Sequence, residues 1–150
     1  MMEQIGIVPL NDDNANAFYS LVEEYLPDSE SDRLKKYAKE FPKAFLTLLM
    51  DHEVIGVAFG WLRSREIPED ASFELNGIAV RYDHQKKTYG KKLLRAFEEA
   101  ALEYGATAVS LGSADGYVEK FYIDCGYVPT EYKFWTEKGP CVEKTYVNME

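Results

Sequence analysis

The sequence SFELNGIAVRYDHQKKTYGKKLL, residues 72–94, decides the fold. Apolar and polar residues alternate over residues 73–80, which predicts a β-strand with two distinct faces. Strict alternation puts Phe73, Leu75, Gly77 and Ala79 on one face, and Glu74, Asn76, Ile78 and Val80 on the other. A glycine inside a strand often marks a β-bulge, so we expect a bulge at Gly77. Such a bulge would leave backbone groups around Ile78 without partners in the sheet.

An amphipathic helix follows this strand. Its apolar face comprises Leu93, Phe97, Ala100, Ala101 and Tyr104, and Gly105 marks its end. We expect its first turn near Tyr89 or Gly90. Positions 81–95 contain six basic residues (81, 86, 87, 91, 92 and 95) and one acid, Asp83. Their local net charge is therefore +5, in a chain whose net charge is −9. Helix N-termini favour anions, so the pattern predicts a phosphate site, and an ordinary solvated lysine surface explains it equally well.

The composition is that of a globular domain. A length of 150 residues with 46% hydrophobic and 29% charged residues predicts one domain over residues 1–150. The chain contains no apolar run of about 18 residues and no signal-peptide pattern, so we expect a cytoplasmic protein without a membrane partner. A pI near 4.8 argues against nucleic acid. The two cysteines and two histidines lack ligand spacing, so we expect no metal and reduced thiols.

The remaining elements follow from periodicity and from glycine and proline positions. Strands are expected over residues 4–9, 44–50, 54–62, 73–80, 107–111, 131–138 and 141–149. Helices are expected over residues 14–26, 29–41 and 116–125, besides the helix that ends before Gly105. A helix separates the strands at 73–80 and 107–111, so these two strands should run parallel through a right-handed crossover.

Two short motifs resemble a known family. QKKTYG at residues 85–90 resembles the Gln/Arg-x-x-Gly-x-Gly/Ala loop, with Gln85 and Gly90 matching and Thr88 in place of the first glycine. EKFYIDCGY at residues 119–127 looks like a late helix and turn of the pattern x-x-Phe-Tyr-x-x-x-Gly-Tyr/Phe. With the apolar strand before them, these motifs resemble the GCN5-related N-acetyltransferase (GNAT) superfamily over about residues 72–127.

The resemblance implies a fold and a cofactor. The fold class is α/β (α+β), the acyl-CoA N-acyltransferase fold, with a mixed central sheet of about seven strands and four helices. Its fourth and fifth strands are parallel and splay apart, and the pantetheine arm of acetyl-CoA lies in the notch between them. A bulge at Gly77 would open this notch and place an amide near Ile78 or Ala79 against the thioester oxygen.

The resemblance also assigns cofactor-binding residues. They are Ile78, Ala79, Val80, Gln85, Lys86, Lys87, Thr88, Tyr89, Gly90, Lys91, Asp115 and Phe121. Asp115 stands where the family often has an asparagine that bonds the pantetheine, and a carboxylate can accept but not donate a hydrogen bond. The family activity needs acetyl-CoA as acetyl donor and no metal.

Two residues match the family's acid and base. An amine with a pKa near 10.4 is almost fully protonated at pH 7, so a base must help to form the nucleophile. Glu74 has the same offset from Val80 as the glutamate base of histone-acetylating members, and a solvent-facing strand residue explains it equally well. Tyr122 matches the acid that protonates the departing thiolate, and a packed core aromatic is the alternative.

The resemblance places the acceptor-binding residues in regions that vary among family members. Family members bind it between the first two helices, the loop after the hairpin and the last hairpin. Here those regions hold Glu23, Glu24, Asp28, Glu30, Glu66, Glu69 and Asp70, beside Tyr25, Tyr132, Phe134 and Trp135. Acids beside aromatics suit a cationic small-molecule or peptide amine, and a solvated acidic face explains them as well.

The expected function is therefore an N-acetyltransferase that moves an acetyl group from acetyl-CoA to a primary amine by direct attack in a ternary complex. A non-catalytic CoA-binding module or a protein-interaction module of the same fold is the alternative. A homodimer is compatible with the sequence.

Overall fold

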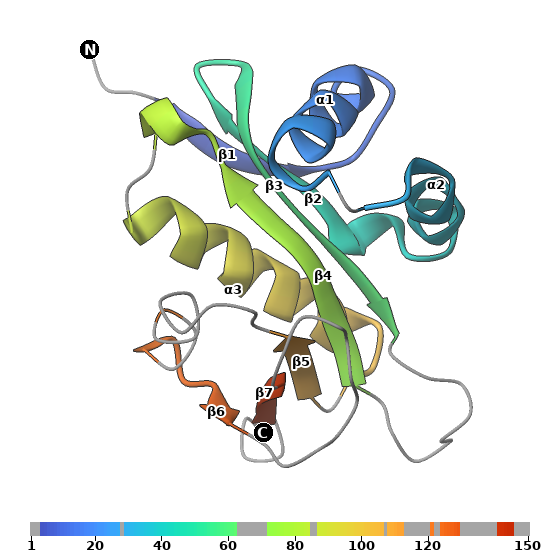
Figure 1. The fold of residues 1–150 in the computed structure, drawn as a ribbon, viewed down its shortest axis with the longest axis vertical. Coiled ribbons are helices and arrows are strands. Elements are labelled where there is room, and N and C mark those ends of the chain that lie inside the picture. Colours follow the sequence, from blue (N-terminus) through green and yellow to red (C-terminus); the bar gives the residue numbers. More distant parts are fainter. Residues whose placement is uncertain are drawn as a thin grey trace.

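The computed structural model describes residues 4–27, 29–62, 72–84, 87–106, 108–112, 121, 124–129 and 141–145. Within these ranges, seven strands form one sheet in the order β1-β2-β3-β4-β5-β7-β6 (Figure 1). The strands are β1 (Ile5–Pro9), β2 (Phe45–Met50), β3 (Glu53–Leu62), β4 (Ser72–Val80), β5 (Ala108–Gly112), β6 (Val128–Pro129) and β7 (Cys141–Thr145). Among the strand pairs that the structure describes, only β4 and β5 pair in parallel, as predicted, and the others are antiparallel.

Helices cover both faces of the sheet. Figure 1 shows α1 (Ala15–Tyr25) and α2 (Ser31–Glu40) on one face and α3 (Lys87–Glu103) on the other. Two short 3-10 turns, η1 (Pro42–Ala44) and η2 (Tyr82–His84), lead into β2 and toward α3. This arrangement confirms the predicted mixed fold. It also explains why β2 and β3 are buried along nearly their whole length, because both of their faces are covered.

The hairpin between β2 and β3 turns tightly. Asp51 and His52 have φ angles of 50° and 73°, the left-handed conformation that a two-residue hairpin turn requires. The predicted hairpin is therefore confirmed, with β3 beginning one residue earlier than expected.

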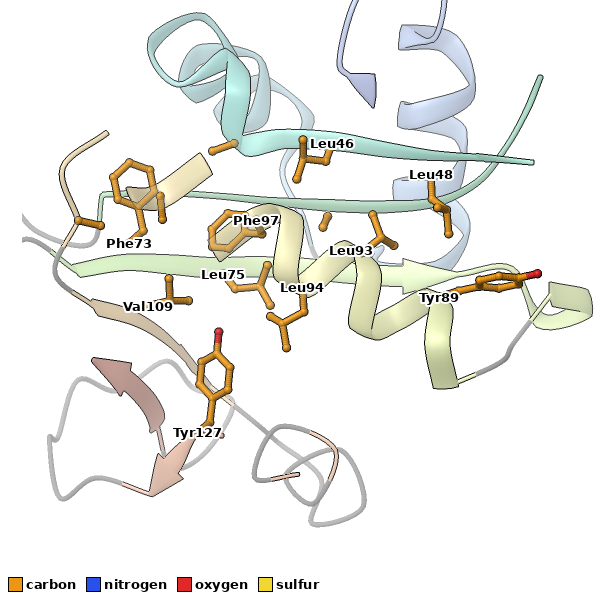
Figure 2. Packing of buried hydrophobic residues seen from close by; sticks show 14 of the residues in the cluster. Leu46, Leu48, Phe73, Leu75, Tyr89, Leu93, Leu94, Phe97, Val109 and Tyr127 are labelled. Atoms are coloured by element: carbon orange, nitrogen blue, oxygen red, sulfur yellow. The ribbon is translucent and has the colours of Figure 1, made fainter. Parts of the chain in front are cut away.

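Each face of the sheet has its own hydrophobic cluster. The α3-side cluster packs Leu93 and Phe97 of α3 against residues of β2 and β4 such as Leu48 and Leu75 (Figure 2). The α1/α2-side cluster includes Phe18 of α1 and Trp61 of β3. The cluster that a strand residue joins therefore shows on which face of the sheet its side chain lies.

A β-bulge interrupts β4 next to Gly77, as predicted. In the pairing with β3, Phe59 lies opposite Gly77 and Gly60 lies opposite Leu75, which leaves Asn76 as an extra residue in β4. A Cβ atom on Gly77 would lie 2.4 Å from Cζ of Phe59. Only glycine fits this position without a shift of its neighbours.

The bulge changes the faces of β4. Phe73 and Leu75 join the α3-side cluster, whereas Ala79 packs against the α1/α2-side cluster and Ile78 against the α3-side cluster. The expectation of strict alternation through residue 80 is therefore wrong. Asn76 adds one residue to the strand, and one extra residue exchanges the two faces of everything that follows.

Helix α3 begins two residues before Tyr89, earlier than expected. Its first turn is solvated, so it lacks the apolar periodicity from which the start was predicted: Thr88, for example, is exposed. The helix ends as predicted at Gly105, whose φ angle is 87°. The N–H of Ala106 donates to the carbonyl of Ala101 at 3.0 Å, as in a Schellman motif.

The C-terminal elements are described in part. Phe121 and Asp124 are helical, and the N–H of Cys125 donates to the carbonyl of Phe121 at 3.2 Å, in agreement with the helix predicted over residues 116–125. Strand β7 confirms the start of the strand predicted over residues 141–149. The strand predicted over 131–138 lies outside the described residues, and in the described part β7 pairs with β5 and β6.

Candidate active site

The parallel strands part in the middle of β4. The β4–β5 pairing runs from Ser72 opposite Ala108 to Leu75 opposite Leu111. Beyond Leu75, β4 continues to its end at Val80 along β3 alone, within the described residues. Within the described residues, this end of the pairing agrees with the predicted splaying of the two strands, which would form the notch on the β5 side of β4.

Two backbone amides of β4 point into the notch. The N–H of Arg81 donates to the carbonyl of Ile55 at 2.8 Å, which fixes the phase of the antiparallel β3–β4 ladder. Because bonded and non-bonded pairs alternate in such a ladder, Ala79 bonds to β3 while Ile78 and Val80 direct their N–H and C=O groups to the other side. Of the two amides expected near the thioester, the geometry favours Ile78 over Ala79.

The first turn of α3 lies beside the late helix. A Cβ atom on Gly90 would lie 3.3 Å from Cζ of Phe121, so two residues of the two motifs, 31 positions apart in the sequence, are in contact. Tyr89 is buried in the α3-side cluster, whereas Thr88 and Lys91 are exposed. The N–H groups of a helix's first turn have no acceptor within the helix, so this turn and the exposed Lys91 can bind an anion. Gln85, Lys86 and the side chain of Lys87 lie outside the described residues.

Arg81 does not belong to the anion site. It forms ion pairs with Glu53 and with Asp83, the latter at 3.2 Å between Nη2 and Oδ2. The hydrogen bond with Glu53 raises the pKa of Arg81. Asp83 also contacts Nδ1 of His84 at 3.0 Å. One of the six basic residues counted in the sequence is therefore already neutralised within the chain.

Glu74 faces the side of the sheet opposite α3. Its neighbours along the strand, Phe73 and Leu75, join the α3-side cluster, so the half-buried Glu74 side chain lies on the α1/α2 side. It lies opposite Trp61 of β3 and in register with Ser110 of β5. A substrate would therefore reach a base at this position from the α1/α2 side of the sheet, opposite α3.

Ser110 was missed by the sequence analysis. It is 1% exposed, and its hydroxyl makes no hydrogen bond within the described part of the chain. The available signal was a serine next to apolar residues in the strand predicted over residues 107–111. Tyr122 and Asp115 lie outside the described residues, so their predicted roles remain predictions.

The predicted acceptor residues fall into separate places. Glu24 and Tyr25 line a groove of about 500 Å³ between α1, the start of β3 and η2, together with Tyr82. The Tyr25 hydroxyl accepts a hydrogen bond from the N–H of Tyr82 at 3.1 Å, and the two ring centroids are 4.8 Å apart. Asp28, Glu66, Glu69, Asp70, Tyr132, Phe134 and Trp135 lie outside the described residues.

The aromatic surface of α2 already carries cations. Tyr37 stacks on Trp61 with a centroid distance of 4.2 Å, and the Arg33 guanidinium carbon lies 5.1 Å from the Trp61 ring centroid. Lys36 lies over Tyr37 at 5.7 Å. These contacts give this part of the α1/α2 face a positive rim, which weakens the expectation of a cationic acceptor.

Comparison with known families identifies the class of protein. The sequence profile of the acetyltransferase (GNAT) family matches residues 10–127. The match covers the notch, the α3 N-terminus and the late helix. The chain belongs to this family.

Solved structures agree with this fold. Arabidopsis thaliana Naa50, bound to a bisubstrate analogue CoA-Ac-MVNAL, has a TM-score of 0.75 at 17% identity, over 94% of this chain and 98% of its own. YncA, a putative acetyltransferase from Salmonella typhimurium with acetyl-CoA, has a TM-score of 0.75 at 14% identity, over 94% and 93%. Aminoglycoside 6'-acetyltransferase type Ii has a TM-score of 0.70 at 17% identity, over 95% and 97%. No curated protein sequence matches the chain.

Metal and membrane features are absent from the described ranges. No group of three or more His, Cys, Asp or Glu side chains there could hold a metal ion. No helix in those ranges is long and apolar enough to span a bilayer.

Proposed function

We propose that this chain, a single acetyltransferase domain over residues 1–150, transfers an acetyl group from acetyl-CoA to a primary amine. The observation that supports the proposal is that the β4–β5 pairing ends at Leu75 while β4 continues to Val80, as the expected notch requires. There the Ile78 and Val80 backbone groups point away from β3, and the notch leads to the N-terminus of α3. A linear thioester cofactor that ends in phosphates needs such a track, with backbone groups along its arm and free N–H groups at its pyrophosphate.

The cofactor residues follow from this track. Ile78 and Val80 bond the pantetheine arm, and the first turn of α3, with Thr88 and Gly90, binds the pyrophosphate. Lys91 and the basic residues before α3 add positive charge. Phe121 packs against Gly90 and closes one side of the track. We assign Gln85, Lys86 and Asp115 to the same site from their positions in the family motifs.

The proposed reaction is direct attack in a ternary complex. The amine nitrogen attacks the thioester carbon from the Glu74 side, and the Ile78 N–H stabilises the oxyanion that develops on the carbonyl oxygen. Glu74 takes the proton that the amine loses, directly or through a water. The C–S bond then breaks, and the CoA thiolate takes a proton from the Tyr122 hydroxyl.

The acceptor is proposed to be a small-molecule or peptide amine. Two proteins of similar fold are named for such chemistry: one structure holds a CoA-peptide analogue, and another protein is an aminoglycoside acetyltransferase. Both support an amine acceptor. The Arg33 and Lys36 contacts on α2 do not favour a strongly cationic acceptor at that rim.

A transfer assay tests the proposal. The full chain is incubated with acetyl-CoA and a panel of primary amines that includes amino acids, peptides, polyamines and aminoglycosides. CoA release and acetylated amine are measured together, and we expect them in equal amounts for at least one amine. A chain that binds acetyl-CoA but acetylates nothing in the panel would support the alternative, a non-catalytic CoA-binding module.

A further inference from the structure

Ser110 presents an unexplained buried hydroxyl. It is 1% exposed, and its Oγ atom has no hydrogen-bond partner within the described residues. A buried hydroxyl without a partner destabilises the folded state, so such a group in a native core calls for a role. Valine or alanine would fill an inward-facing strand position without this cost.

The hydroxyl faces the proposed acceptor side. Val109 joins the α3-side cluster, so alternation along β5 puts Ser110 on the opposite, α1/α2 face. Ser110 pairs in register with Glu74, and parallel neighbours in register share a face, with strands about 4.8 Å apart. Glu74 is half-buried, so this face is open to solvent one strand away from Ser110.

The pair also lies at the edge of the notch. The β4–β5 pairing ends one position later, at Leu75 opposite Leu111. The proposed oxyanion donor Ile78 follows the bulge on the same strand as Glu74. Two oxygen acceptors, a carboxylate and a hydroxyl, therefore lie side by side on the face from which the amine is proposed to approach.

We propose that Ser110 and Glu74 together hold the two N–H bonds of a primary amine acceptor. The inference rests on the proposed acetyl transfer. A neutral primary amine has two N–H donors and one lone pair. Glu74 accepts one N–H and later its proton, and Ser110 Oγ accepts the other, so the lone pair points to the thioester carbon. No proton leaves through Ser110, which retains its hydrogen bond to the remaining N–H of the amide product.

This arrangement defines a substrate class. A secondary amine has only one N–H, which the base must take, so it cannot satisfy Ser110 as well. The enzyme should therefore prefer primary amines over their N-methyl counterparts. Part of that preference should depend on the Ser110 hydroxyl and not on the space available for the methyl group.

The test compares matched acceptors. The best primary amine of the panel and its N-methyl counterpart are assayed with wild type, Ser110→Ala and Ser110→Thr. Ser110→Ala should lower kcat/KM about threefold to tenfold for the primary amine and less than twofold for the N-methyl amine, the size expected for one hydrogen bond. Ser110→Thr keeps a hydroxyl and should restore the wild-type preference. If Ser110→Ala does not fold, Ser110→Cys replaces it, because a thiol is a weak acceptor.

The outcomes separate the two proposals. An equal loss for both amines, or none, would assign Ser110 a packing role and overturn this inference, while acetyl transfer by the wild type would leave the proposed function standing. Failure of the wild type to acetylate either amine would overturn both. Thermal midpoints of the variants that are equal to or above that of the wild type provide the control for folding.

Discussion

The Tyr127 hydroxyl donates a hydrogen bond of 2.8 Å to Oε2 of Glu98, and both side chains are buried. This contact joins the turn after the late helix to the middle of α3 (Figure 2 shows Tyr127 beneath Leu94 of that helix). The late helix carries the proposed acid, and α3 carries the proposed phosphate site. The hydrogen bond therefore helps to hold two parts of the proposed active site together.

Removal of this hydroxyl should destabilise the fold. Tyr127→Phe keeps the ring and deletes a hydrogen bond to a buried carboxyl group, so we expect a loss of about 1.5 to 3 kcal/mol in the free energy of unfolding. Urea denaturation measures it. Tyr82→Phe is the matched control, because Tyr82 is 76% exposed and should lose almost nothing. Equal midpoints for the two variants would show that the Tyr127 hydroxyl contributes nothing to stability.

Gly77 should not tolerate a side chain. In Gly77→Ala, the new Cβ would lie 2.4 Å from Cζ of Phe59 and 2.9 Å from Cδ1 of Leu26, so the bulge must move. We expect a loss of about 1 to 3 kcal/mol in stability and a fall in acetyl transfer, because the bulge sets the direction of the Ile78 amide. Gly6→Ala is the control, since nothing lies within 4 Å of its Cβ. Wild-type activity and stability in Gly77→Ala would refute the proposed role of the bulge.

A base at Glu74 predicts a pH-dependent defect. Glu74→Gln should slow the reaction most at neutral pH and recover as rising pH supplies free amine, whose pKa is near 10.4. The ratio of mutant to wild-type rate, measured from about pH 6 to 9.5, should therefore rise with pH. Glu99→Gln on the exposed surface of α3 should follow the wild type at every pH. A flat ratio for Glu74→Gln would move the base elsewhere.

Substitution of Tyr122 distinguishes an active acetyltransferase from a protein that only binds the cofactor. Tyr122→Phe deletes only the hydroxyl, so acetyl-CoA affinity and stability should change little while turnover falls about 100-fold, the lower end for a general acid. Steady-state kinetics and a thermal melt measure these effects, with Tyr19→Phe on α1 as control. Turnover at the wild-type rate with normal binding would make Tyr122 a packed aromatic only.

Periodicity in the sequence predicted most of the framework. The β2–β3 hairpin, the parallel β4–β5 pair and the Gly105 stop of α3 are confirmed, because each depends on local patterns or on a glycine with a definite conformation. The start of α3 was predicted two residues late. Its exposed first turn has no apolar pattern to mark it.

The faces of β4 and the role of Ser110 could not be predicted in this way. Gly77 indicated a bulge, but which residue is extra depends on how β4 pairs with β3, and only that pairing shows Asn76 to be the one. Similarly, a lone serine in an apolar strand carries no motif. Its significance depends on its register with Glu74 across two segments that are distant in sequence.

Calorimetric titration of the full chain with acetyl-CoA tests the proposed cofactor site most directly. Wild type should bind one equivalent, with affinity that falls as salt is added. Lys86→Glu with Lys91→Glu should weaken binding about tenfold or more at low salt, because both charges lie at the proposed pyrophosphate site. Lys39→Glu, exposed on α2 across the sheet, should bind as the wild type does. Absence of binding by the wild type, or unchanged affinity in the double variant, would contradict the assignment.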